Sequence, residues 1–215
     1  MQHRLTHALL PLAIASALAV PASNAADQMP LYKKVGDWSI HVDETLANGC
    51  FAAGIWNGGT LFRLGVDNNP PPTLYVIIGN VKWRSLERGK EYDIDLTFGD
   101  ETPWTLTASG FQFDDESGAT YLYADIGKPS NEKTKAFVDE FMRELSVRIV
   151  YQGNHVDTLR LTGSYDATET LFECQALMDR TGSRDDPFAA PAQTSDDPFD
   201  LVTRSLKEPW VLKKE

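Results

Sequence analysis

The seven residues from Tyr92 to Phe98, YDIDLTF, alternate strictly between apolar and polar side chains. Successive side chains of a β-strand point to opposite faces of its sheet. One face of this segment is therefore apolar and carries Tyr92, Ile94, Leu96 and Phe98. A strand with one apolar and one polar face is typical of an antiparallel sheet that covers a core on one side only.

Turn signals on both sides of this segment predict more strands, joined by hairpins. NGG at residues 57–59 lies between two apolar runs, and GN at 153–154 lies between two others, because glycine and asparagine tolerate the positive φ of tight turns. TLYVIIGN at 73–80 is a continuous apolar run, which favours a strand buried on both faces. VGDWSIHV at 35–42 is predicted to form the first strand.

Two segments have helical spacing instead. Residues 130–145 place Phe137, Val138, Phe141, Met142 and Leu145 on one apolar stripe, with Ser130 or Asn131 as the expected N-cap. Residues 164–179 place Ala167, Leu171, Cys174 and Met178 on one face. We therefore expect an α+β fold, a mostly antiparallel β-sandwich or partly open barrel with two covering helices.

The first 28 residues, MQHRLTHALLPLAIASALAVPASNAADQ, have the layout of a secretory signal peptide. Arg4 precedes an apolar run of about 15 residues, and Ser23 and Ala25 are the small residues of an A-x-A-like cleavage site. The alternative is a membrane anchor, but a spanning helix needs roughly 20 apolar residues. We expect cleavage after residue 25 and a periplasmic or secreted mature chain without a membrane span.

The mature chain is expected to contain a single α+β domain at 26–179 and an acidic tail at 180–215. The tail repeats DDPF at 185–188 and 196–199, contains four prolines, and has few residues that could bury apolar area at regular spacing. Such a segment is expected to be disordered. The apolar tip around Trp210 is a candidate docking peptide for another envelope protein, although motifs this short also occur by chance.

Charge argues against nucleic acid as a partner. The net charge of the full sequence is −11, which becomes −12 when Arg4 leaves with the signal peptide. A strongly acidic protein without a stripe of lysine and arginine repels phosphate backbones.

The chain has only two cysteines, Cys50 and Cys174, which are 124 residues apart. A nucleophilic Cys174 would need a nearby base, and the mature chain keeps only His41 and His155, neither in a recognisable motif. In an oxidising compartment two cysteines most simply pair with each other, so we predict a structural disulfide, with two buried free thiols as the alternative.

No sequence motif identifies a catalytic residue, a metal site or a cofactor site. CxxC and HExxH zinc patterns, a phosphate-binding GxxxxGK[ST] loop and a GxSxG elbow are all missing from the sequence. One stretch, VKWRSLERGKEY, is locally basic and aromatic. If a small anionic ligand binds, the expected contacts are Trp83, Arg84 and Arg88.

Three pieces of sequence carry a family resemblance: VGDW at 35–38, GC at 49–50 and LRLTGSYDATETLFECQ at 159–175. Together they resemble the invasion-associated locus B family, which consists of small periplasmic or secreted bacterial proteins with a predominantly β domain. The stretch WRSLERGKEYDIDLTFG at 83–99 is also similar to other exported alphaproteobacterial proteins. The resemblance implies no catalytic residues.

These observations predict an exported non-enzymatic protein of a Gram-negative envelope that binds a protein partner or a small ligand. The alternative is a periplasmic hydrolase that acts on polysaccharide or peptidoglycan through a pair of carboxylates, because any two acids could converge in the fold.

Overall fold

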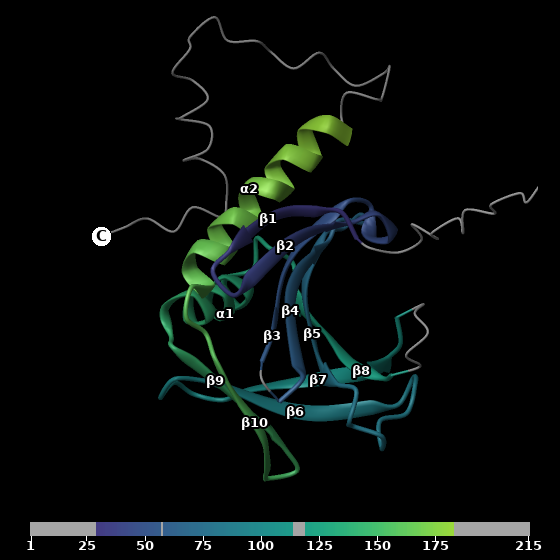
Figure 1. Cartoon of the computed structure of the whole chain (residues 1–215), viewed down its shortest axis with the longest axis vertical. Helices are drawn as coiled ribbons and strands as arrows, with labels where there is room; N and C mark the ends of the chain where they lie inside the picture. Colours follow the sequence, from purple (N-terminus) through teal and green to yellow (C-terminus); the bar gives the residue numbers. More distant parts are fainter. Residues whose placement is uncertain (1–28, 57, 114–118, 183–215) are drawn as a thin grey trace, which may run out of the picture.

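The computed structural model describes residues 29–182, except residue 57 and residues 114–118. The proposed signal peptide lies outside the described residues, and so does the predicted tail from residue 183 onward, with its DDPF repeats and Trp210. The first three residues of the predicted tail, 180–182, are helical instead. The described chain folds into one antiparallel sheet and two α-helices (Figure 1).

The sheet has ten strands in the order β1-β2-β3-β4-β5-β8-β7-β6-β9-β10. Their bounds are β1 Leu31–Val35, β2 Trp38–Asp43, β3 Gly49–Ile55, β4 Thr60–Asp67, β5 Thr73–Asn80, β6 Glu91–Phe98, β7 Trp104–Phe111, β8 Tyr121–Gly127, β9 Ser146–Tyr151 and β10 Asn154–Arg160. A short 3-10 helix, η1 Glu44–Leu46, joins β2 to β3. The structure confirms the α+β class and the antiparallel pairing, and the sheet is not closed into a barrel.

The predicted first strand is divided in two. Gly36 and Asp37 form a turn between β1 and β2, and Gly36 has a φ of +57°, which glycine adopts without strain. The NGG and GN signals both lie in hairpins as expected, between β3 and β4 and between β9 and β10. β5 is buried along nearly its whole length, as its continuous apolar run predicted.

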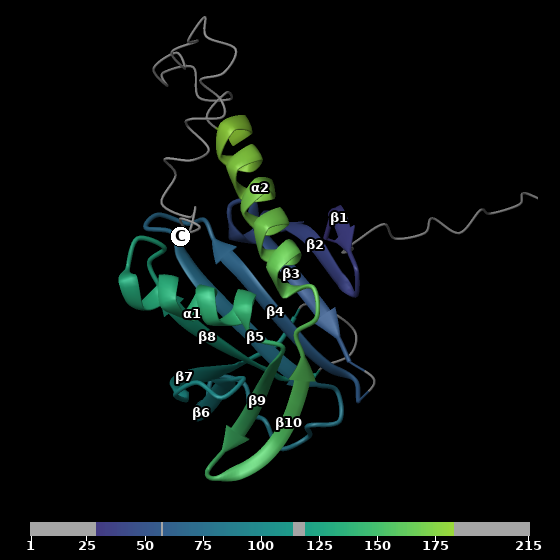
Figure 2. The same cartoon turned by 90° about the vertical axis from the view of Figure 1, so that its left-hand side faces the viewer.

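Helix α1 spans Glu132–Arg143, and the side chain of Asn131 accepts a hydrogen bond from the backbone of Lys133 as its N-cap. Helix α2 spans Ser164–Gly182. Figure 2 shows α2 running across β1–β3 and α1 crossing below it, beside β8. Leu145 differs from the prediction: α1 ends at Arg143, so Leu145 lies beyond the apolar stripe and its side chain is 74% exposed.

The main core lies between the inner face of the sheet and the two helices. Phe141 of α1 stacks on Phe62 of β4 with ring centroids 5.5 Å apart and meets Trp38 of β2 edge to face at the same separation. The predicted pairing of the two cysteines is confirmed. The Cys50–Cys174 disulfide joins β3 to α2, and the side-chain oxygen of Gln175 accepts a 2.8 Å hydrogen bond from the backbone of Cys50.

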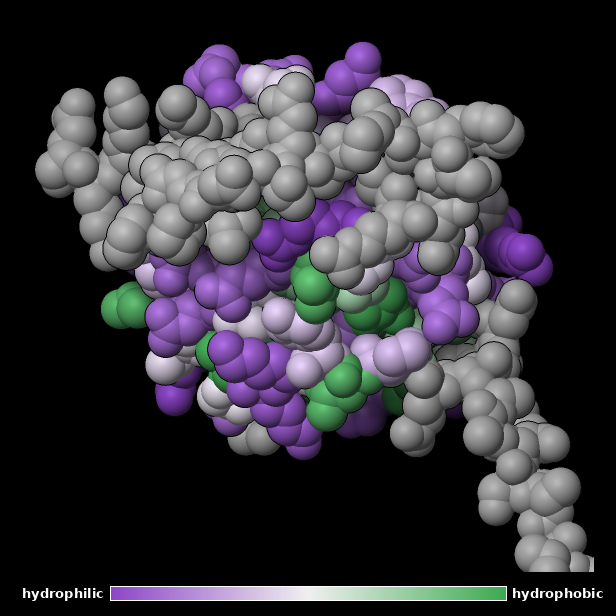
Figure 3. Space-filling model, turned by 90° about the horizontal axis from the view of Figure 1, so that it is seen from above, coloured by the Kyte–Doolittle hydropathy of each residue, from purple (hydrophilic) through white to green (hydrophobic). Residues whose placement is uncertain are grey.

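The surface seen from above is mixed. In Figure 3 hydrophilic side chains separate individual hydrophobic ones over the visible part of the described chain. Single exposed apolar residues are ordinary on protein surfaces. Neither helix of the described part combines the length and the apolar character that crossing a membrane would require.

Candidate functional site

The sheet curls until β10, its last strand, approaches β2 and β3 from the other end of the strand order (Figures 1 and 2). We call the gap between β10 and the pair β2–β3 the seam. Two tryptophans bridge it. The indole nitrogen of Trp56 donates to the carbonyl of Arg160 at 2.9 Å, and that of Trp38 donates to the carbonyl of Thr162 at 3.1 Å.

One further side-chain contact reaches β10, and two bonds from Asn80 hold the β3–β4 turn beside it. The hydroxyl of Thr60 donates to the carboxylate of Asp157 at 2.6 Å. The side-chain amide of Asn80 donates to the carbonyl of Gly58 at 2.8 Å and to the Thr60 hydroxyl at 3.2 Å. These bonds fix the β3–β4 turn against β10, so side chains rather than a strand ladder hold the seam together.

A pocket of about 540 Å³ opens along the seam. Its lining includes Asp37, Trp38, Gly54, Ile55, Trp56, Asp157, Thr158, Arg160 and Thr162. The volume lies within the range of small-molecule sites in proteins. Ile55, at the end of β3, has 73% of its side chain exposed, which is the second-highest exposure among the described large apolar residues.

Two charged side chains at the pocket have no partner within the part of the chain that the structure describes. Asp37 and Arg160 are both exposed, and neither side chain makes a hydrogen bond or ion pair with another residue in the described part of the chain. Asp157 differs, because its Oδ2 accepts from Thr60 and its Oδ1 accepts from the backbone of Thr158 at 2.8 Å. The pocket thus offers one free carboxylate and one free guanidinium beside two indole rings.

The three residues predicted from sequence, Trp83, Arg84 and Arg88, lie in the loop between β5 and β6 and do not line this pocket. Trp83 is half-buried and packs against the main core. Arg84 and Arg88 are exposed, and neither forms an ion pair with any described residue. The loop approaches the pocket at one point, where the ammonium group of Lys82 lies 3.5 Å from the carbonyl of Gly58. A role for the three residues in anion binding stays a prediction.

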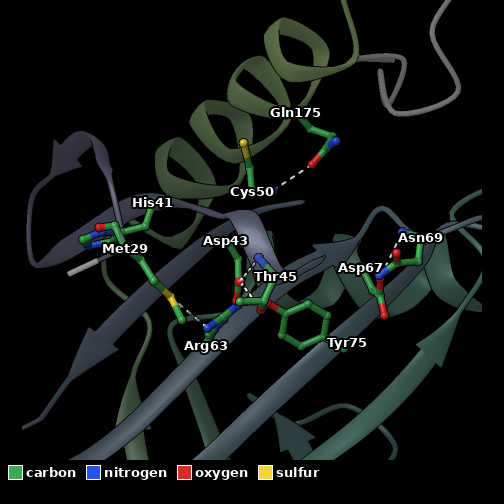
Figure 4. Close-up of polar contacts among 10 residues, drawn as sticks. All are labelled: Met29, His41, Asp43, Thr45, Cys50, Arg63, Asp67, Asn69, Tyr75 and Gln175. Carbon is green, nitrogen blue, oxygen red and sulfur yellow. Dashed lines mark hydrogen bonds and ion pairs between the residues drawn. The ribbon is translucent and has the colours of Figure 1, made fainter. Parts of the chain in front are cut away.

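The outer face of the sheet carries a buried ionic cluster that the sequence did not identify (Figure 4). The guanidinium of Arg63 on β4 forms a 2.5 Å ion pair with Asp43, donates to the hydroxyl of Tyr75, and lies 3.5 Å above the ring of Phe51. Arg63 is only 2% exposed. Its position within the apolar segment TLFRLGV was the one available signal, since a lone charge there must find a buried partner.

This cluster also holds the beginning of the described chain. A nitrogen of Arg63 lies 3.5 Å from the sulfur of Met29, and the ring nitrogen Nδ1 of His41 lies 2.9 Å from the carbonyl of Met29. The backbone of Val42 donates to the carbonyl of Pro30 at 3.0 Å. The cluster therefore ties the segment leading into β1 to strands β2 and β4.

The environment of the cluster shifts the pKa values of its members. Burial raises the pKa of the Asp43 carboxyl, but hydrogen bonds from Arg63 and Thr45 and the guanidinium charge outweigh burial and leave the pKa below its ordinary value. Burial raises the pKa of Tyr75 well above its ordinary value. Burial, together with Asp125 and Asp67, raises the pKa of the neighbouring Tyr123 to about 12. The cluster thus holds an ionised Asp–Arg pair beside neutral tyrosines.

No group of three or more histidine, cysteine, aspartate or glutamate side chains within residues 29–113 and 119–182 is placed to hold a metal ion. Comparisons with protein-family models, curated proteins and solved structures find no match to this chain.

Proposed function

We propose that the chain is an exported, non-enzymatic binding protein of the bacterial envelope, periplasmic or secreted, whose small ligand occupies the seam pocket. The observation that carries this proposal is the pocket itself, where Ile55 is exposed and the side chains of Asp37 and Arg160 have no partner among the described residues. A few polar groups that converge on a partly apolar cavity are the usual composition of a ligand site.

Export is supported by the signal-peptide layout and by the Cys50–Cys174 disulfide. Disulfides form and persist in oxidising compartments such as the periplasm. The disulfide joins the start of β3 to α2, and Ile55 lies at the other end of the same strand.

The carboxylates of the pocket favour binding over hydrolysis. Glycoside hydrolysis requires two carboxyl groups that are free to act as acid and as base or nucleophile. Asp37 and Asp157 are the two acids that line the pocket, and both oxygens of Asp157 already accept hydrogen bonds from Thr60 and Thr158. Asp37 alone cannot supply both groups.

Ile55 offers a direct test. A fragment library and the low-molecular-weight fraction of a periplasmic extract would be screened by ¹H–¹⁵N NMR, with the Trp56 indole resonance assigned from Trp56→Phe. We expect at least one compound to shift this resonance and the amides of residues 37 and 38. Ile55→Asp should weaken its binding about tenfold or more, because a charge replaces apolar contact.

Leu145→Asp is the matched control, since Leu145 is 74% exposed against 73% for Ile55, lies in the α1–β9 connection and does not line the pocket. Its ligand affinity should equal that of the unmodified protein. The proposal fails if no compound perturbs the Trp56 resonance, or if Ile55→Asp and Leu145→Asp have the same affinity.

A further inference from the structure

We infer that the ligand of the seam pocket is a saccharide, whose ring packs on Trp56 and whose hydroxyl groups bind Asp37 and Arg160. This inference rests on the proposed function and names the chemical class of the ligand.

The orientation of Trp56 is fixed before any ligand arrives. Its indole nitrogen is held by the carbonyl of Arg160, and its ring meets Trp38 edge to face with centroids 5.4 Å apart. Gly54 makes room for the ring, because a Cβ at that position would lie 2.8 Å from the Cη2 atom of Trp56. A ring held in this way loses little conformational entropy on binding.

Trp56 therefore contributes the surface of its aromatic ring to the pocket. Its one N–H donor is already used inside the protein, and its side chain is half-buried and lines the cavity. The face of an aromatic ring is electron-rich and attracts groups with positive edges. The C–H groups on one side of a pyranose ring are flat, apolar and slightly positive, which suits such a surface.

The side chains of Asp37 and Arg160 suit the hydroxyl groups of a sugar. A hydroxyl group both donates and accepts hydrogen bonds. Asp37 supplies an acceptor, and Arg160 supplies several donors in a planar fork. Because neither side chain has a partner in the described chain, binding a hydroxylated ligand displaces water without breaking an internal bond.

Other ligand classes fit less well. A wholly apolar ligand would bury Asp37 and Arg160 without partners, which is costly. A peptide that paired with β10 as an added strand would need the backbone groups on the exposed edge of β10. Two of them are already used, because the carbonyl of Arg160 accepts from Trp56 and the N–H of Thr158 donates to Asp157. Nucleic acid is disfavoured by the net charge of the chain.

The test is a titration of the full mature protein with defined glycans. Binding is measured by calorimetry and by the NMR shift of the Trp56 indole resonance. The probes are N-acetylglucosamine oligomers, the disaccharide of N-acetylglucosamine and N-acetylmuramic acid, galacturonic acid oligomers and maltose. We expect at least one to bind and to shift the Trp56 resonance. Trp56→Leu should weaken it about tenfold or more, while Trp56→Phe, which keeps an aromatic face, should stay within about threefold.

Asp37→Asn provides a second variant that does not depend on packing, because Asp37 is exposed in the β1–β2 turn. It should weaken glycan binding about fivefold or more, since an amide replaces a charged acceptor. Asp100→Asn, at an exposed turn aspartate after β6, is the matched control and should bind normally. If Trp56→Leu does not fold, the Asp37 pair carries the test alone.

The saccharide inference is overturned if none of the glycans binds. It is also overturned if a glycan binds Trp56→Leu and Asp37→Asn as tightly as it binds the parent protein. Failure of the saccharide inference is distinguishable from failure of the proposed function. A non-saccharide compound from the screen whose binding depends on Ile55 would uphold the seam pocket and reject the sugar.

Discussion

Trp38 and Trp56 meet edge to face with their ring planes at 80°. The indole nitrogen of Trp56 donates to the carbonyl of Arg160, and that of Trp38 donates to the carbonyl of Thr162, two residues further along the chain. In a closed barrel the next strand would supply such donors to the edge of β10. Here two side chains from neighbouring strands supply these donors in place of a strand. The pocket exists because this replacement holds the seam together at a few points without closing it along its length.

The two tryptophans should contribute unequally to stability. Trp38 is buried and Trp56 is half-buried, so Trp38→Phe should leave a cavity in the core and the carbonyl of Thr162 without its indole donor. We expect Trp38→Phe to lower the free energy of unfolding by about 2–3 kcal/mol and Trp56→Phe by about 0.5–1.5 kcal/mol. Urea denaturation followed by circular dichroism measures both values. Equal losses would show that Trp38 is no more important to the seam than Trp56.

The disulfide should account for a large share of the stability of the domain. Cys50 and Cys174 close a loop with a sequence separation of 124 residues, for which the chain-entropy model gives about 4–5 kcal/mol as an upper figure. We expect the double variant Cys50→Ala/Cys174→Ala to unfold with about 2–5 kcal/mol less free energy than the parent protein in urea.

The state of the two thiols can be checked separately by intact-mass measurement of protein purified without reductant. Iodoacetamide should add nothing under denaturing conditions until a reductant is present, and should then label both cysteines. Labelling without reductant would mean that the two sulfurs are not bonded in the purified protein.

Local patterns in the sequence were sufficient to predict the class of the fold and its hairpins. The alternation in YDIDLTF, the glycines of the β3–β4 and β9–β10 turns and the apolar stripe of α1 each report on neighbours along the chain. The disulfide was predictable for another reason, because an exported chain with two cysteines has one simple pairing. Leu145 was misplaced because its spacing continues the stripe of a helix that ends at Arg143.

The seam could not be predicted in the same way. Trp56 and Arg160 are separated by 104 residues, and nothing near either residue indicates that β10 curls back to the end of β3. The ionic cluster has the same character, since Asp43 and Arg63 come from strands whose sequence patterns say nothing about each other. Such contacts depend on the curvature of the whole sheet.

Asp43 should make stability depend on acidity. Its pKa is lower in the folded protein than in the unfolded chain, where the pKa of an aspartate is about 3.9. The stabilisation from ionised Asp43 is therefore fully present above that value and is lost as the pH falls through the folded pKa. We expect the free energy of unfolding to fall more steeply as the pH drops below about 4 in the parent protein than in Asp43→Asn.

Asp100→Asn serves as the control for this acid dependence, because it removes an exposed carboxylate outside the cluster. Its unfolding free energy should follow the parent curve. The same acid slope in Asp43→Asn as in the parent protein would contradict the assignment.

The Arg63–Asp43 pair should also show strong energetic coupling. Arg63→Met leaves the buried Asp43 carboxylate without its counter-ion, and removing one member of a buried pair typically costs about 3–5 kcal/mol. The double variant Arg63→Met/Asp43→Asn removes both charges while the Asn side chain can still accept from the backbone of Thr45, the bond that caps η1. We therefore expect the double variant to be more stable than Arg63→Met alone, with a coupling of at least about 2 kcal/mol in a double-mutant cycle measured by urea denaturation. Additive losses would mean that the two charges are stabilised independently of each other, and the cluster would then be two separate hydrogen-bonded sites on the outer face of the sheet.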